Sequence, residues 1–65
     1  MEKLTNREMT VLKLVMQGYA NNEISQKVFI SIHTVKAHIG SIIRKLSAKN
    51  RAHAVYLALK NNLVD

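Results

Sequence analysis

The chain has 65 residues, which is enough for one small domain, and we expect residues 1–65 to form that single domain. It contains no cysteine, so a disulfide framework and a thiolate metal site are both excluded. Its apolar runs are far shorter than the roughly 20 residues that span a bilayer, and nothing at the N-terminus resembles a signal peptide. We therefore expect a soluble domain of the cytoplasm with no membrane partner.

The net charge of +6 is distributed unevenly along the chain. Residues 1–26 carry three basic and three acidic side chains, whereas residues 27–65 carry seven basic side chains against Asp65 alone. A one-sided excess of this kind is typical of a domain that binds a polyanion, although a solvated helix surface has the same charge pattern. The order of the predicted helices decides between these two interpretations.

Four helical segments follow one another without a linker or repeat, which indicates an all-α fold. The first segment spans about residues 6–17 and begins with the spacing of a capping box. In that motif the Thr5 hydroxyl accepts a hydrogen bond from the backbone of Glu8, and the Glu8 carboxylate reaches back to Thr5. Gly18 supplies the left-handed residue that is expected to end the helix.

The second helix is short, about residues 22–28, and either Asn21 or Asn22 can cap it. We expect Phe29 and Ile30, which follow it, to lie in the core. Ser31 is then the expected N-cap of the third helix. The connection of about three residues has the length of the turn in a helix-turn-helix.

The third segment, about residues 32–46, sorts its residues around the helix by size and charge. One stripe is apolar and is expected to face the core: Ile32, Val35, Ile39, Ile42, Ile43 and Leu46. The opposite face carries the small residues Ala37, Gly40 and Ser41, with polar and basic residues beside them. An apolar back and a slim basic front are what a helix needs to enter the major groove of B-DNA.

The side chains on this front are the candidate DNA contacts. Lys36 can donate to guanine O6 and N7, and Ala37 can touch a thymine methyl group. The full set expected at the base edges is Lys36, Ala37, Gly40 and His33. The set expected at the DNA backbone, where contacts position the protein without reading sequence, is Asn22, Ser31, Thr34, His38, Arg44 and Lys45. Taken singly, each of these residues would also be ordinary on a solvated surface.

The fourth segment, about residues 51–61 after a cap at Asn50, has two apolar stripes. The first contains Ala54, Leu57 and Ala58, with Val55 near its edge. The second lies nearly opposite and contains Ala52, Tyr56, Leu59 and Leu63. One stripe must face the core, and the other favours burial against the same helix of a second subunit. A small fold that buries both stripes internally is the alternative.

Two runs of residues make the pattern familiar: Leu4-Thr5-Asn6-Arg7-Glu8, and Ile30-Ser31 followed by Thr34-Val35-Lys36 and His38. Further matches lie at 11–12, 14, 18, 21–24, 42, 45–46, 51 and 54–55. Over residues 4–64 the chain resembles the LuxR/NarL-type (GerE-like) DNA-binding domain found at the C-terminus of many bacterial response regulators. The resemblance implies a four-helix fold in which the second and third helices form the helix-turn-helix.

The resemblance also implies transcription regulation, binding as a dimer to two half-sites, and dimer contacts through the fourth helix. RNA polymerase is then a candidate partner. In such domains the positions of Lys36, Ala37 and Gly40 face the bases. Some relatives carry a long side chain where this chain has Gly40, which shifts sequence reading here toward Lys36, His33 and DNA shape.

Other departures from the family pattern are structural. Ala20 stands where a serine or threonine often caps the second helix, so Asn21 is expected to take part of that role. Ser25 stands where alanine is usual, at a tight helix crossing. Arg51 has two interpretations, a contact with phosphate or an ion pair with Glu8 that ties the fourth helix to the first, and we favour the ion pair.

No catalytic constellation is present in the sequence. The acidic residues are not paired at useful spacing, and His33, His38 and His53 do not form a metal-binding pair four residues apart on a helix. We therefore expect no enzyme activity, no metal and no cofactor. Three alternative functions stay open: a free-standing small LuxR-type regulator, a sigma-factor region 4 module that docks on RNA polymerase, and a protein-interaction or anionic-membrane module that uses the fourth helix.

Overall fold

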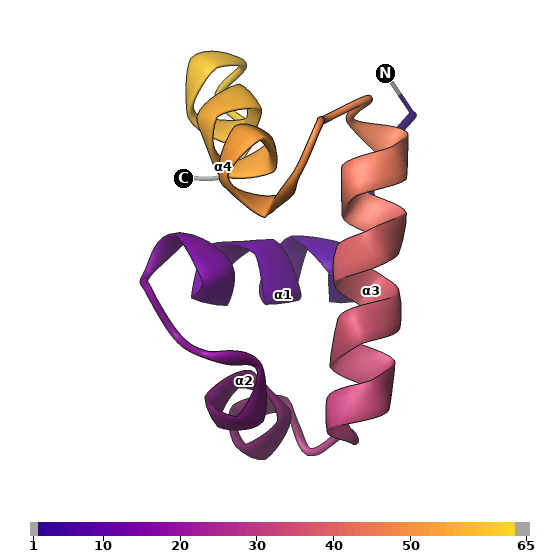
Figure 1. Cartoon of the computed structure of the whole chain (residues 1–65), viewed down its shortest axis with the longest axis vertical. Coiled ribbons are helices and arrows are strands. Elements are labelled where there is room, and N and C mark those ends of the chain that lie inside the picture. Colours follow the sequence, from indigo (N-terminus) through magenta and orange to yellow (C-terminus); the bar gives the residue numbers. More distant parts are fainter. Residues whose placement is uncertain (1, 64–65) are drawn as a thin grey trace.

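The computed structural model describes residues 2–63, and in it the chain forms four helices joined by short turns (Figure 1). Helix α1 spans Asn6–Met16, α2 spans Asn21–Val28, α3 spans Ile32–Lys45 and α4 spans Arg51–Lys60. Every helix end lies within one residue of its predicted position, and no strand occurs in residues 2–63, so the predicted all-α fold is confirmed. Within the same range no helix is long and apolar enough to cross a membrane.

Side chains close in the sequence start three of the helices. At α1 the Glu8 N–H donates to Thr5 Oγ1 at 3.1 Å and the Thr5 N–H donates to Glu8 Oε1 at 2.9 Å. At α3 the Thr34 N–H donates to Ser31 Oγ, and at α4 a backbone N–H donates to Asn50 Oδ1. These caps are the predicted ones, because capping depends only on residues within one turn.

Helix α2 begins differently from the prediction. Its N-cap is Ala20, which has no side-chain acceptor, and the Ala20 N–H instead donates to Glu23 Oε1 at 2.8 Å. The prediction that Asn21 or Asn22 caps this helix is wrong. Asn21 is the first helical residue, and its side chain accepts a hydrogen bond from Arg51.

The core lies where α3 crosses the other helices. Helix α3 contacts all three of them, with α2 and α4 near its opposite ends and α1 between (Figure 1). The fully buried apolar residues come from every helix: Val11, Leu12, Ile24, Val35, Ile42, Leu46, Ala54 and Ala58. The predicted apolar stripe of α3 therefore packs inward along most of its length.

Two residues expected in the core lie on the surface instead. Phe29 is 93% exposed, and Ile32 at the start of α3 is also exposed. Phe29 ends α2 in the left-handed conformation (φ 58°), in which its N–H and that of Ile30 both donate to the Ser25 carbonyl. This turn directs the Phe29 side chain outward and leaves Ile30 as the residue that packs against the core. A left-handed backbone costs a non-glycine residue about 1–2 kcal/mol.

Candidate nucleic-acid interface

The front of α3 is open to solvent. Lys36, Ala37 and Gly40 are exposed, as are His33 and Arg44 on the same helix. The back of the helix is held by residues that are fully buried, among them Val35 and Ile42. The structure therefore brings the residues expected at base edges onto one uncovered face of α3, which is the geometric condition for entry into a groove.

Gly40 has no structural reason within the described part of the chain to be glycine. A Cβ atom built on it would meet no heavy atom within 4 Å, and its backbone is helical. Glycine inside a helix costs about 1 kcal/mol relative to alanine. A surface that approaches α3 closely from outside the domain would make use of the missing side chain.

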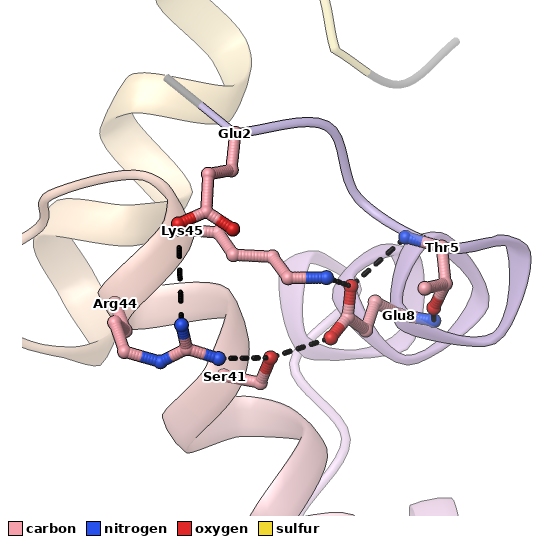
Figure 2. A network of polar contacts seen from close by, with 6 residues as sticks. All are labelled: Glu2, Thr5, Glu8, Ser41, Arg44 and Lys45. Carbon is pink, nitrogen blue, oxygen red and sulfur yellow. Dashed lines mark hydrogen bonds and ion pairs between the residues drawn. The ribbon is translucent and has the colours of Figure 1, made fainter.

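Helical periodicity places Ser41 on the open face of α3, but in the structure this side of α3 packs against α1 (Figure 2). The Ser41 hydroxyl donates to Glu8 Oε2 at 2.6 Å, and Lys45 Nζ lies 2.8 Å from Glu8 Oε1. The Lys45 side chain is only 15% exposed. Ser41 is therefore not part of the open front, and the Lys45 ammonium group, which was expected at the DNA backbone, binds a buried carboxylate within the domain.

The Glu8 carboxylate is the centre of this contact and is almost completely buried, at 4% exposure. Burial alone raises the pKa of Glu8. The hydrogen bonds from Lys45, Ser41 and the Thr5 backbone together outweigh burial and lower the pKa from 4.5 to about 2. Glu8 is thus a permanent anion that fastens the C-terminal half of α3 to the start of α1.

Acidification should destabilise the domain through Glu8. Because the folded pKa of about 2 lies below the ordinary 4.5, the unfolded chain takes up the proton first. The contribution of Glu8 is complete above pH 4.5 and is lost as the pH falls toward 2, and it amounts to about 3 kcal/mol. Urea unfolding at a series of pH values measures this loss. The Glu8→Gln variant should lack this component, and an equal loss in both proteins would assign the acid sensitivity to other groups.

Arg44 lies at the outer edge of the same network and stays at the surface. Its Nη2 donates to Ser41 Oγ at 3.3 Å, and its Nη1 lies 4.0 Å from Glu2 Oε1 (Figure 2). Both partners of the second contact are largely exposed, so it is weak and exchangeable. Unlike Lys45, Arg44 is therefore available to a phosphate group.

The other residues expected at the DNA backbone lie at helix starts or on the flank of α3. Asn22 is exposed in the first turn of α2, and His38 is half-buried. Ser31 and Thr34 hydrogen-bond to each other through their hydroxyls at 2.9 Å, which holds the N-terminal turn of α3 in place. Both remain at the surface with acceptor and donor capacity to spare.

Arg51 does not form the predicted pair with Glu8. Its Nη1 donates to the Asn21 side chain and its Nη2 to the Tyr19 carbonyl at 3.2 Å. Lys45 holds Glu8 instead. Arg51 therefore ties the start of α4 to the turn before α2, a connection for which the sequence carries no local signal.

Only one apolar stripe of α4 is buried within the domain. Ala54 and Ala58 are in the core, whereas Tyr56 is 54% exposed, Leu59 is 62% exposed and Ala52 is exposed. Leu63, expected on the outer stripe, is half-buried and packs against the core. The alternative in which the fold buries both stripes is therefore wrong for the described residues.

Helix α2, a three-residue turn and the exposed basic helix α3 together define a helix-turn-helix domain. Residues 2–58 match the family described as bacterial regulatory proteins, luxR family, and the chain belongs to this family. The predicted membership is confirmed and leaves the sigma-factor alternative without support. The family consists of DNA-binding regulators and not of enzymes, which agrees with the expectation of no catalytic activity.

Similar domains occur as part of longer proteins and as nearly the whole of a short chain. The chain is 44% identical over 64 residues to the response regulator protein VraR of Staphylococcus aureus. The aligned residues make up 98% of this chain and 31% of VraR. VraR of Staphylococcus saprophyticus is equally similar. The structure of the transcription factor GerE superimposes with a TM-score of 0.91 at 31% identity, covering 100% of this chain and 97% of that one.

The response regulator ChrA, from a heme-sensing two-component system, has a TM-score of 0.91 at 36% identity, with 98% of this chain and 32% of ChrA covered. This chain thus spans about a third of the length of VraR and ChrA and nearly the whole of the GerE chain.

Proposed function

We propose that this chain binds double-stranded DNA sequence-specifically and regulates bacterial transcription, with α3 lying in the major groove. The observation that carries the proposal is the uncovered front of α3, where Lys36 stands beside the small residues Ala37 and Gly40. A helix that is slim and basic on its open side fits a groove about 12 Å wide. The family membership of the chain supports the same function.

Within this proposal Lys36 reads guanine by donating to O6 and N7, and Ala37 contacts a thymine methyl. Gly40 permits close approach and makes no base contact of its own, and His33 reaches a base or a phosphate from the first turn of α3. The DNA backbone is bound by Asn22, Ser31, Thr34, His38 and Arg44. Lys45 is left out of this set, because it is bound to Glu8.

Dimerisation through α4 is the second part of the proposal. The exposed Tyr56 and Leu59 form an apolar surface with Ala52, and Leu63 borders it from the end of the helix. Two copies joined along this surface in an isologous contact would present two α3 helices to two half-sites. The dimer would bury the solvent-exposed apolar area of these side chains.

We further propose that the chain is the effector domain of a two-component response regulator that acts in the cytoplasm. This rests on the similarity to VraR and ChrA, of which the chain covers about a third. A free-standing small regulator is the second candidate, favoured by the GerE chain, of which 97% is covered. RNA polymerase is a candidate partner in either setting.

Selection of bound duplexes from random DNA, followed by a gel shift with Lys36→Ala, tests the DNA proposal. Loss of a base-reading lysine should weaken binding to the selected duplex about tenfold and flatten preference at one base position. Affinity for unselected DNA should fall little. Lys13→Ala, which removes an exposed lysine from α1, is the matched control and should change both affinities slightly and equally.

The outcomes separate the candidate functions. If wild-type chain selects no duplex, sequence-specific DNA binding is wrong. If it selects one and Lys36→Ala binds it unchanged, DNA binding stands but α3 does not read bases through Lys36. If Lys36→Ala weakens binding to all sequences equally, Lys36 contacts phosphate and not bases.

A further inference from the structure

Phe29, in the turn between α2 and α3, combines a strained backbone with an exposed apolar side chain. Its backbone is left-handed (φ 58°) and its side chain is 93% exposed. The other non-glycine residues with positive φ in residues 2–63 are Ser47 and Asn62, which are small and polar. Glycine or asparagine would close this turn with less strain than a bulky aromatic residue. Strain and apolar exposure coincide here, and neither serves the packing of the domain.

The surroundings of Phe29 are apolar and basic. Ile32 is exposed three residues later, in the first turn of α3. Before the turn, Arg7 donates to the Val28 carbonyl at 3.4 Å, and Lys27 lies 4.7 Å from the centre of the Tyr19 ring. Figure 1 shows that the α2–α3 turn lies at the same end of the molecule as the first turn of α3.

The charges indicate what kind of surface could cover this apolar pair. Every charged side chain in residues 24–63 is basic, and Arg7 adds another positive charge at the turn. An uncharged or basic protein surface would meet no complementary charge here, whereas duplex DNA offers phosphates beside the apolar faces of deoxyribose and thymine. The turn also continues directly into the helix that is proposed to enter the groove.

We propose that Phe29, together with the exposed Ile32 three residues later, makes an apolar contact with DNA at the edge of the major groove, against deoxyribose or a thymine methyl group. This inference rests on the proposed function and adds a DNA-contacting residue outside the front of α3 to it. The contact offsets the strain of the turn only when DNA is bound. The free domain is therefore less stable than it would be with glycine or asparagine at this position. Phe29 thus contributes to DNA affinity and not to the stability of the fold.

The variant Phe29→Asn tests this directly, because asparagine suits the left-handed turn but offers no apolar surface. We expect its Tm to rise by about 5 °C, since strain is relieved in a domain of this size. We expect its affinity for the selected duplex to fall about tenfold, as half of an aromatic side chain loses its burial. The slope of log K against log salt should stay unchanged, because no phosphate contact is removed.

Phe29→Leu is the matched control, since it keeps an apolar side chain in the same strained backbone. It should bind the duplex within about threefold of wild type and gain no thermal stability. Replacement of the contacted thymine by uracil should weaken wild type and leave Phe29→Asn unaffected if the contact is to the methyl group. If it is to deoxyribose, uracil should affect neither protein at that position, and the Phe29→Asn loss should persist.

Failure of this inference is distinguishable from failure of the proposed function. If wild type binds the selected duplex and Phe29→Asn binds it equally well, the DNA contact of Phe29 is wrong while DNA binding stands. If Phe29→Asn keeps DNA affinity but loses recruitment of purified RNA polymerase to that duplex, the apolar pair docks on protein and the inference is overturned. If wild type binds no duplex, the proposed function fails first.

Discussion

Replacing Glu8 with alanine should lower the free energy of unfolding by about 3–5 kcal/mol, a loss as large as that from truncating a fully buried core residue. The substitution leaves the Lys45 ammonium group, whose side chain is 15% exposed, without its carboxylate. It also removes the acceptor of the Ser41 hydroxyl and of the Thr5 backbone. A domain below about 70 residues has a total stability of only about 3–5 kcal/mol from its core, so most of the variant should be unfolded.

Far-UV circular dichroism and urea titration at pH 7 measure this effect. Glu2→Ala is the control, because its ion pair with Arg44 spans 4.0 Å between largely exposed side chains and should be worth about 0.5 kcal/mol or less. The double variant Glu8→Leu with Lys45→Met removes both buried charges and should recover most of the stability. If Glu8→Ala is as stable as Glu2→Ala, or if the double variant is no better than Glu8→Ala, the ion pair does not hold α1 to α3.

Tyr56→Glu should weaken binding to a duplex with two half-sites by about 100-fold and binding to a single half-site by less than about threefold. The side chain is 54% exposed at the centre of the apolar surface of α4, and a second copy would place another Tyr56 or Leu59 against it. A carboxylate in that contact would be desolvated next to an apolar surface, which abolishes the dimer. The gain that two linked α3 helices have over one would then be lost.

Gel shifts on duplexes with one and two selected half-sites, run at the same salt concentration, measure the difference. Gln17→Glu changes the net charge equally at the exposed end of α1 and controls for simple repulsion from DNA. Its loss should be small and the same on both duplexes. Equal losses on one and two half-sites for Tyr56→Glu would show that α4 does not join the two copies.

At two positions on the α2–α3 surface, the residue present makes the free domain less stable than another residue would. Gly40 occupies a helix interior where alanine would fit without a contact, and Phe29 occupies a left-handed turn where asparagine would be less strained. Both residues are exposed and neither packs against the core. Stability of this kind is commonly given up where a surface must meet a partner, which agrees with a binding role for this side of the molecule.

Local features of the fold followed from the sequence alone. The starts of α1, α3 and α4 were predictable because a cap needs only an acceptor side chain and the N–H groups one turn later. The open front of α3 was also predictable, since the 3.6-residue period places Lys36, Ala37 and Gly40 away from Val35 and Ile42. These features depend on distances along the chain of a few residues.

The tertiary structure decided what lies against the flanks of each helix. Periodicity assigns an angle around one axis but does not say which neighbouring helix covers that angle. Ser41 and Lys45 lie within a turn of the open front, yet α1 covers them through Glu8, more than 30 residues away. Arg51 likewise meets Asn21 and not Glu8, because the position of α4 depends on how it packs against α1 and α3.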